Sequence, residues 1–218
     1  MINYQETKTL VTKDNNNSAN CIAPNLIYGC FGGCVDTYCY MSRYNGHRVF
    51  VNTNVDQIFK SVVEWEKDFV KVPDQQDPVY TMVDIACNTD LVLMQKFMPE
   101  SLHDYLKRYD DHPQLNSTMA TKYPRLLRLD VNHFNKEPRV RVSLMPQKYS
   151  KILEPKMQSI RSRINDINRL KLLGWEVHLN YSPLVFYPGW KEEYENLFKQ
   201  VKEIAGENKC EVIALTNH

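Results

Sequence analysis

Three cysteines, Cys30, Cys34 and Cys39, lie close together in a glycine-rich stretch that begins at Gly29. They are half of the six cysteines in the chain. Glycine can adopt the positive φ values of a tightly wrapped loop, so the three sulfurs can point toward one centre. Thiolates are soft ligands that favour iron–sulfur clusters or zinc. The spacing therefore predicts a metal centre on this loop.

The choice between the two metals depends on a fourth ligand. A structural zinc site takes four ligands, usually in closely spaced pairs. The nearest further candidates are Cys21 and His47, and neither completes such a pair. Three cysteines without a clear fourth fit a [4Fe–4S] cluster whose open iron binds a substrate or cofactor. The alternatives are chance spacing and a disulfide cluster, and the absence of a recognisable signal peptide argues against disulfides.

Composition indicates an ordinary globular protein. The 218 residues are 43% hydrophobic and 24% charged, enough for one large domain or two small ones. A net charge of +1 provides no overall attraction to nucleic acid or to an anionic membrane. No apolar run approaches the ~20 residues that a membrane-spanning helix needs. We therefore expect a cytoplasmic protein.

The elements that must position the cysteine loop follow from hydrophobic periodicity. Residues 1–20 are polar, and we expect a flexible arm there and one domain over 21–218. Apolar runs predict six strands, at 22–28, 79–86, 118–122, 139–144, 175–182 and 210–215. Helical periodicity predicts helices at about 54–68, 91–109, 156–173 and 189–205, with Pro99 interrupting the second.

Short links between these strands and helices argue for parallel βαβ units in an α/β fold. Six such strands predict a partial (β/α)6 barrel or a doubly wound sheet. In both architectures the ligand site lies at the carboxyl ends of the strands. The cysteine loop leaves the first predicted strand at that end.

Other polar residues follow the predicted strands at the same end. Cys87, Thr89 and Asp90 follow the second strand, Lys122 ends the third, and Ser143 ends the fourth. Each has an ordinary structural interpretation: a packed thiol, a surface charge or a turn residue. Their shared position at the strand ends favours the functional interpretation.

Seven segments of the sequence match the motifs of a known enzyme family, in the same order along the chain and at similar spacing. They are Gly-Cys-x3-Cys…Tyr-Cys-Tyr at 29–40, Arg-Val-Phe-Val-Asn at 48–52, Cys-Asn-Thr-Asp at 87–90, Thr-Lys-Tyr at 121–123, the strand at 139–143, Glu-Pro at 154–155, and Ser-Pro-Leu-Val-Phe-Tyr-Pro-Gly-Trp at 182–190. On these segments, which span about 28–215, the chain resembles radical S-adenosylmethionine (AdoMet) enzymes. Within them it is most similar to the spore photoproduct lyase family.

The resemblance implies a site. The three loop cysteines would ligate three irons of a [4Fe–4S] cluster, and the fourth iron would bind the methionyl amine and carboxylate of AdoMet. Thr89, Asp90, Lys122 and Ser143 match positions that contact this cofactor in the family. A lysine can pair with the methionyl carboxylate through a charge-assisted hydrogen bond.

The resemblance also implies catalytic residues. Cys87 matches the position of a hydrogen-atom donor, and Tyr38 and Tyr40 match tyrosines that flank it. An S–H bond is weak enough to quench a carbon radical, so this thiol would complete a radical reaction. An external electron donor would have to reduce the cluster.

Three departures from the family bear on the substrate. The second cysteine gap, 35–38, has four residues where the family has two. The N-terminal region of the lyase is largely missing, and the chain ends where the lyase continues into a segment that grips DNA. With a net charge of +1, nucleic acid is therefore not the expected partner.

A related branch, the protein spliceases of ribosomal peptide maturation, fits these departures better. The resemblance then implies excision of tyramine from a Tyr-Gly site of a precursor peptide, which leaves an α-keto-β-amino acid. A small partner protein would recognise the precursor. A DNA photoproduct lyase is the alternative, and an iron–sulfur protein without radical chemistry is the third hypothesis.

Overall fold

A computed structural model describes the chain from residue 1 to residue 214, except residues 16, 36–38, 40–47 and 73–75, and leaves 215–218 undescribed. Its main sheet has seven strands in the order β10-β9-β8-β7-β6-β3-β2. Their bounds are β2 Lys13–Asp14, β3 Cys21–Ile22, β6 Thr81–Asp84, β7 Leu115–Thr121, β8 Arg139–Ser143, β9 Glu176–Leu184 and β10 Cys210–Ala214.

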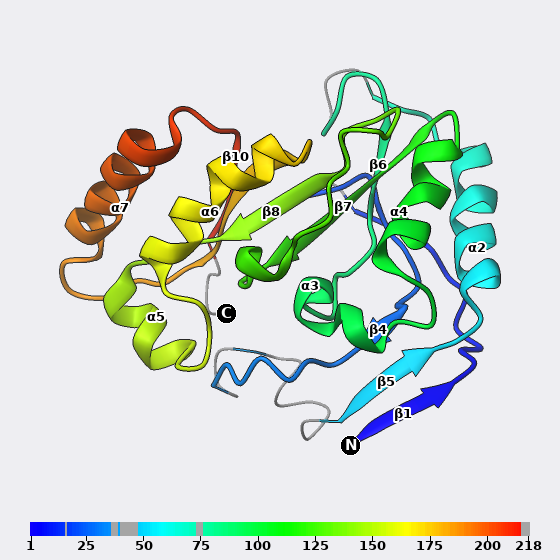
Figure 1. Ribbon diagram of the computed structural model, residues 1–218, viewed down its shortest axis with the longest axis horizontal. Coiled ribbons are helices and arrows are strands. Elements are labelled where there is room, and N and C mark those ends of the chain that lie inside the picture. The colour runs from blue at the N-terminus through cyan, green and yellow to red at the C-terminus, as the bar shows by residue number, and fades with distance from the viewer. Residues whose placement is uncertain (16, 36–38, 40–47, 73–75, 215–218) are drawn as a thin grey trace.

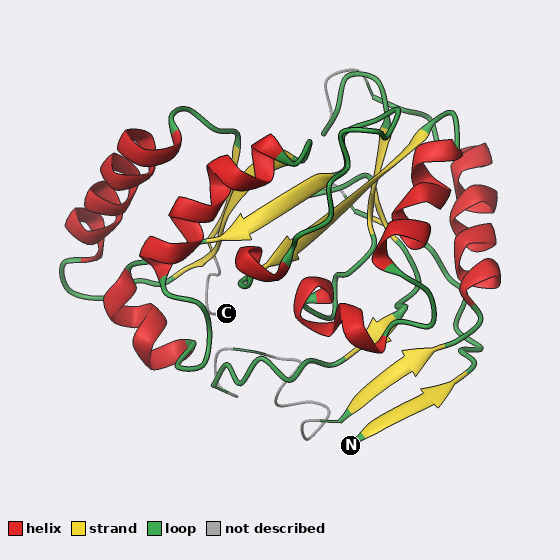
Figure 2. Cartoon of the chain, in the orientation of Figure 1, coloured by secondary structure: helices red, strands yellow, loops and turns green. Residues whose placement is uncertain are grey.

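Strand order in this sheet decides between the two predicted architectures. From β3 to β10 each strand pairs in parallel with the next one along the sheet, and only the short β2 is antiparallel to its neighbour β3. A doubly wound sheet would reverse its strand order at a switch point, and the described strands do not. The sheet curls in Figure 2. The prediction of a partial barrel is confirmed, and the doubly wound alternative is wrong.

Helices connect the strands and cover the sheet. In Figure 1, α2 and α4 lie at one end of the molecule, and α5, α6 and α7 lie at the other. Their bounds are α2 Val55–Asp68, α3 Leu91–Met94, α4 Leu102–Asp111, α5 Gln147–Leu153, α6 Ile160–Leu172 and α7 Trp190–Ala205. Among the described residues, no helix is long and apolar enough to cross a bilayer.

The predicted helix at 91–109 is two helices, separated by a 3-10 turn and by Pro99. Proline lacks the N–H that a helix interior requires. The second helix, α4, then starts from a new cap, because the Ser101 hydroxyl accepts a hydrogen bond from the Asp104 N–H at 3.1 Å. Helix α5 was not predicted.

Helix α6 illustrates how the core forms. Ile160, Ile164, Ile167 and Leu170 are buried and recur at helical spacing, so they form one apolar stripe. This helix packs against β9 and α7. The amphipathic pattern that predicted the helix is therefore the surface that attaches it to the sheet.

The predicted strand at 22–28 is also divided. Its first part, β3, belongs to the main sheet, and its second part, β4 Ile27–Tyr28, belongs to a small sheet of order β1-β5-β4. The Ala23 N–H still donates to the Asp84 carbonyl at 3.0 Å. Pro24 follows and has no N–H for the ladder, so the chain leaves the main sheet there. Strand β4 is the one that delivers the cysteine loop.

The expected flexible arm at residues 1–20 is instead attached to both sheets. Strand β1 Ile2–Gln5 pairs in parallel with β5 Val49–Asn52, and β2 pairs with β3. The Asn54 side chain holds the Thr7 backbone through two hydrogen bonds of 3.0 Å. The prediction failed because it considered only apolar burial. A polar strand can add to a formed sheet edge through backbone hydrogen bonds.

Candidate cofactor pocket and active site

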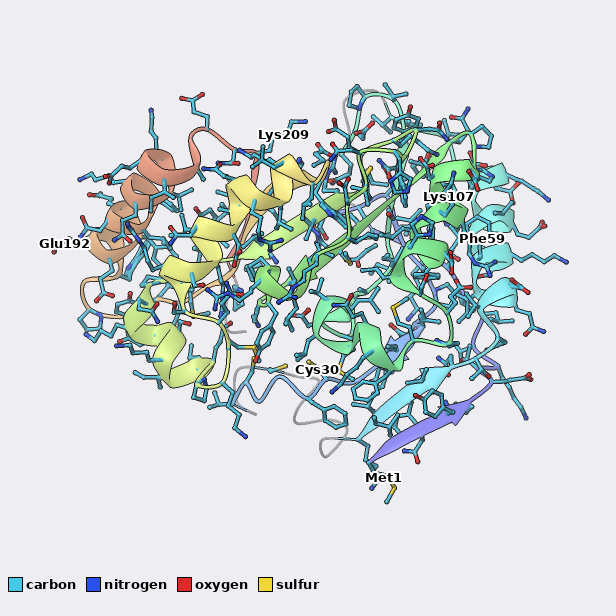
Figure 3. The ribbon with its side chains drawn as sticks, in the orientation of Figure 1. Met1, Cys30, Phe59, Lys107, Glu192 and Lys209 are labelled. Atoms are coloured by element: carbon cyan, nitrogen blue, oxygen red, sulfur yellow. The ribbon has the colours of Figure 1, made fainter. Side chains whose placement is uncertain are left out.

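A pocket of about 170 Å³ lies at the carboxyl ends of β6, β7 and β8. It is lined by every predicted site residue that the structure describes: Cys30, Cys34, Cys39, Cys87, Thr89, Asp90, Lys122 and Ser143. Figure 3 labels Cys30, which lies at the lower edge of the view with other sulfur atoms around it. Tyr38 and Tyr40 lie outside the described residues.

Glycine is required at the entrance to the cysteine loop. Gly29 has a φ of +93°, and a Cβ there would lie 2.4 Å from the Arg48 carbonyl oxygen. A Cβ on Gly32 would lie 2.3 Å from the Met157 Cε atom and 3.2 Å from the Cys30 sulfur. The contact at Gly29 is with backbone that cannot easily move, whereas the Met157 Cε atom ends a flexible side chain that can shift. The glycines therefore allow the loop to fold closely around its own sulfurs.

The loop is fastened to the turn that follows β6. The Gly29 N–H donates to the Asn88 carbonyl at 3.2 Å, and the Thr89 hydroxyl donates to the Gly29 carbonyl at 2.8 Å. Farther along, the Val35 N–H donates to the Leu153 carbonyl at 2.9 Å. Thr89 therefore lines the pocket and also holds the cysteine loop in place through its hydroxyl group.

The donor set fits a group larger than one ion. Among the described residues, no three His, Cys, Asp or Glu side chains converge on a point where one metal ion could bind. A zinc ion needs its ligand sulfurs at about 2.3 Å from a shared centre. Cys30, Cys34 and Cys39 instead surround a cavity. A cluster, in which each iron takes one thiolate, fits this arrangement.

The surroundings of Cys30 and Cys34 favour the protonated thiols when no metal is bound. Burial, followed by the charge of Asp90, raises the pKa of Cys30. A hydrogen bond with Cys39, followed by burial, raises the pKa of Cys34 although Lys122 opposes it. Metal ligands must be thiolates, so assembly of a metal centre would release protons.

A buried chain of charges supports Lys122, whose Nζ lies 3.8 Å from the Cys34 sulfur in the pocket. Glu154 Oε1 lies 3.1 Å from Lys122 Nζ, and Glu154 Oε2 lies 2.7 Å from Arg163 Nη2. Arg163 Nη1 also donates to the Ser143 carbonyl at 2.9 Å. Burial raises the pKa of Glu154, but Lys122 and Arg163 outweigh it and hold that pKa below its ordinary value. Glu154 therefore stays ionised between two cations.

Asp90 lines the pocket, but both of its carboxylate oxygens have protein partners. Oδ1 accepts from the Leu93 N–H at 3.2 Å and from the Thr121 hydroxyl at 2.9 Å. Oδ2 accepts from the Lys122 N–H at 2.8 Å. The carboxylate thus joins the start of α3 to the end of β7. Its geometry suits positioning of Lys122 more than direct contact with a cofactor.

Cys87 lies just beyond β6 and is exposed on the pocket wall. Burial by the surrounding walls, together with the charge of Asp84, raises the pKa of its thiol to about 11. Arg141 and Lys13 oppose this rise only in part. The S–H bond therefore stays intact at neutral pH, which a hydrogen-atom donor requires.

Alkylation of Cys87 by iodoacetamide is expected to be slow at pH 8. Its rate should rise about tenfold per pH unit up to about pH 11, because only the thiolate is the nucleophile. Mass spectrometry of the Cys87 peptide measures this rate, with free cysteine as the reference at its ordinary pKa of about 8.5. A plateau near pH 9 would contradict the raised pKa.

Arg163 is the site-supporting residue that sequence reasoning missed. Its side chain is 0% exposed and lies on the buried face of α6 between Ile160 and Ile164. The sequence does indicate a buried ion pair here, because an arginine lies within the apolar stripe of a predicted helix and such a charge is almost never buried without a partner. Its partner, Glu154, belongs to the Glu-Pro segment that matches the family, but it was not predicted as a site residue.

Together, the curled parallel sheet and the cysteine-lined pocket define a partial-barrel protein whose site lies at the strand ends. The family model described as spore photoproduct lyase matches residues 5–216, and the chain belongs to that family. Spore photoproduct lyase of Clostridium acetobutylicum is 24% identical over 196 residues, which cover 89% of this chain and 55% of the relative. The chain thus spans about half the length of this curated relative.

Solved structures show the same fold. Spore photoproduct lyase complexed with dinucleoside spore photoproduct has a TM-score of 0.78 and 22% identity, over 93% of this chain and 57% of that chain. A double mutant of the lyase with bound AdoMet and dinucleoside spore photoproduct has the same TM-score, identity and coverage. At this identity, the likeness establishes the architecture.

Proposed function

We propose that this chain is a radical AdoMet enzyme. Cys30, Cys34 and Cys39 would hold a [4Fe–4S] cluster, and AdoMet would bind in the same pocket against Lys122 and Ser143. One observation carries the proposal: a single pocket at the strand ends collects three cysteines, a lysine and a further thiol from three separate segments. Membership of the family supports it.

When bound, the cluster and AdoMet would supply one electron and a 5′-deoxyadenosyl radical that abstracts a hydrogen atom from the substrate. The chain's own residues bind, orient and exclude water. The Lys122 ammonium group can donate to the methionyl carboxylate while Glu154 holds it in place at 3.1 Å. Thr89 holds the cysteine loop, and Asp90 holds the Lys122 backbone.

Replacement of Lys122 by alanine is expected to weaken AdoMet binding by roughly 10- to 100-fold, because a charge-assisted hydrogen bond contributes about 1.5–3 kcal/mol. Equilibrium dialysis with reconstituted, anaerobic protein measures the dissociation constant. Lys151→Ala is the matched control, since Lys151 is exposed on α5 and does not line the pocket. Equal affinity in Lys122→Ala and Lys151→Ala would remove Lys122 from the cofactor site.

Cys87 would return a hydrogen atom from its sulfur after the substrate radical fragments. Cys87→Ala is expected to cleave AdoMet normally but to yield an altered or stalled product. Chromatography of 5′-deoxyadenosine and mass spectrometry of the product separate the two steps, and Cys210→Ala provides an exposed-thiol control. If Cys87→Ala makes the normal product at the normal rate, Cys87 is a structural residue.

Two substrates are candidates, and the comparisons support one of them better. The family description points to photoproduct-lyase chemistry on DNA, and the two lyase structures described above contain dinucleoside spore photoproduct. The second candidate is a precursor peptide, modified as a splicease would modify it and held by a small partner protein. The net charge of +1 favours this second candidate, because DNA binding depends on neutralising several phosphates.

A paired assay distinguishes the two candidates. The reconstituted chain is incubated anaerobically with AdoMet and reductant, in one arm with dinucleoside spore photoproduct and in the other with a Tyr-Gly-containing peptide and its partner protein. Conversion of the photoproduct to thymines assigns the chain to repair. Loss of tyramine from the peptide assigns it to peptide maturation.

A further inference from the structure

A second cavity adjoins the cofactor pocket. It measures about 560 Å³, and Cys87 and Asn88 line both spaces. The thiol that would return a hydrogen atom therefore lies where the two cavities meet. A substrate in the second cavity could reach Cys87 from the side opposite the rest of the cofactor pocket.

One wall of this cavity is an extended segment of the N-terminal region. Gln5, Thr7, Thr9, Val11 and Lys13 line it, at every second position of the chain. The residues between them point elsewhere. Leu10 packs against the hydrophobic core, and the Thr12 hydroxyl shares a hydrogen bond of 3.3 Å with the Ser61 hydroxyl. Gln5 ends β1 and Lys13 begins β2, whereas the backbone between them is irregular and bends at Lys8, so Thr7, Thr9 and Val11 line the cavity from a loop.

Hydrogen bonds made by asparagine and glutamine side chains connect other residues of the lining. The Asn52 amide donates to the Asn25 carbonyl at 2.6 Å, and the Asn88 amide donates to Asn25 Oδ1 at 2.8 Å. The Gln5 amide donates to Asn52 Oδ1 at 3.3 Å, which joins these residues to the N-terminal wall. These contacts form a built cavity rather than a gap between mobile side chains.

Several polar groups of the described lining remain available to a ligand. Among the described residues, the Thr9 hydroxyl, Asn88 Oδ1 and Lys13 Nζ have no hydrogen-bond or ion-pair partner. Lys13 is the single charged side chain among the described residues that line the cavity. The lining is otherwise made of neutral amides, hydroxyls and apolar groups.

We propose that this cavity binds an extended peptide segment of the substrate and presents its reacting residue at Cys87. The proposal rests on the radical function proposed above. The uncharged hydrogen-bonding side chains of Gln5, Thr7 and Thr9 on this wall can pair with the N–H and C=O groups of an extended peptide. A nucleic acid would need several cations along its backbone, and the lining supplies one.

The test compares two variants of the same segment. Thr9→Trp would fill the cavity, whereas Lys8→Trp adds the same bulk at a neighbouring exposed position that does not line it. The probe is a fluorescein-labelled twelve-residue peptide with a central Tyr-Gly and one acidic residue, added to the full reconstituted chain. Fluorescence anisotropy should show at least a tenfold loss of affinity in Thr9→Trp and less than a twofold change in Lys8→Trp.

A second measurement uses the unmodified chain and does not depend on the folding of a variant. The peptide should protect Cys87 from alkylation, and dinucleoside spore photoproduct at equal concentration should not. Equal peptide affinity in the two variants, or protection by the photoproduct alone, would overturn the proposal. Absence of AdoMet cleavage by the unmodified chain would instead count against the radical function, so the two failures are distinguishable.

Discussion

Replacement of Cys30, Cys34 or Cys39 by alanine is expected to reduce bound iron and sulfide to background and to abolish AdoMet cleavage. In the cluster that we propose, each of these cysteines is the one protein thiolate on its iron, so its loss leaves that iron without a protein ligand. Anaerobic reconstitution followed by iron and sulfide analysis measures the loss. Because the pKa values of the Cys30 and Cys34 thiols are raised, loading of the unmodified chain should also improve as the pH rises.

Cys21 and Cys210 supply the controls for this experiment. Neither lines the cofactor pocket, so Cys21→Ala and Cys210→Ala should load a full cluster. Cys21 is fully buried, so its variant should lose some stability without losing iron. Full loading of any one of the three loop variants would refute the assignment of that cysteine as a ligand.

Replacement of Glu154 by alanine is expected to cost about 3–5 kcal/mol of folding free energy, because it leaves Arg163 buried without its ionic partner. It should also weaken AdoMet binding, since Lys122 loses the contact that orients it. Urea unfolding measures the first effect and equilibrium dialysis the second. Glu64→Ala is the matched control, because it breaks only an exposed, solvent-screened pair with Lys67 and should leave stability almost unchanged.

The direction of the pH effect on this pair follows from the lowered pKa of Glu154. A carboxylate with a lowered pKa in the folded state contributes stability above its unfolded pKa, and that contribution is lost as the pH falls through the folded pKa. The stability difference between the unmodified chain and Glu154→Gln should therefore shrink on acidification below about pH 4.3, the ordinary glutamate pKa. A constant difference would show that the charge of Glu154 is not what stabilises the fold.

Local periodicity was sufficient to predict most of the barrel. Strands β6 to β10 and helices α2, α6 and α7 were predicted close to their observed positions, because each carries an apolar pattern that is independent of its neighbours. The elements that went wrong depend on partners distant in the chain. The segment at 1–20 becomes ordered by pairing with β3 and β5, and the strand at 22–28 divides between two sheets.

For the site, the sequence by itself determined which residues meet. Parallel strands bring their carboxyl ends to one edge, so Cys87, Lys122 and Ser143 had to lie near the cysteine loop once the strands were recognised. Only the tertiary structure decided how they are held: Glu154 at the end of α5 pairs with Lys122, and Arg163 of α6 binds both Glu154 and the Ser143 carbonyl. It also decided that a second cavity opens beside Cys87. Contacts between distant segments depend on side-chain packing in three dimensions, which no local pattern of residues encodes.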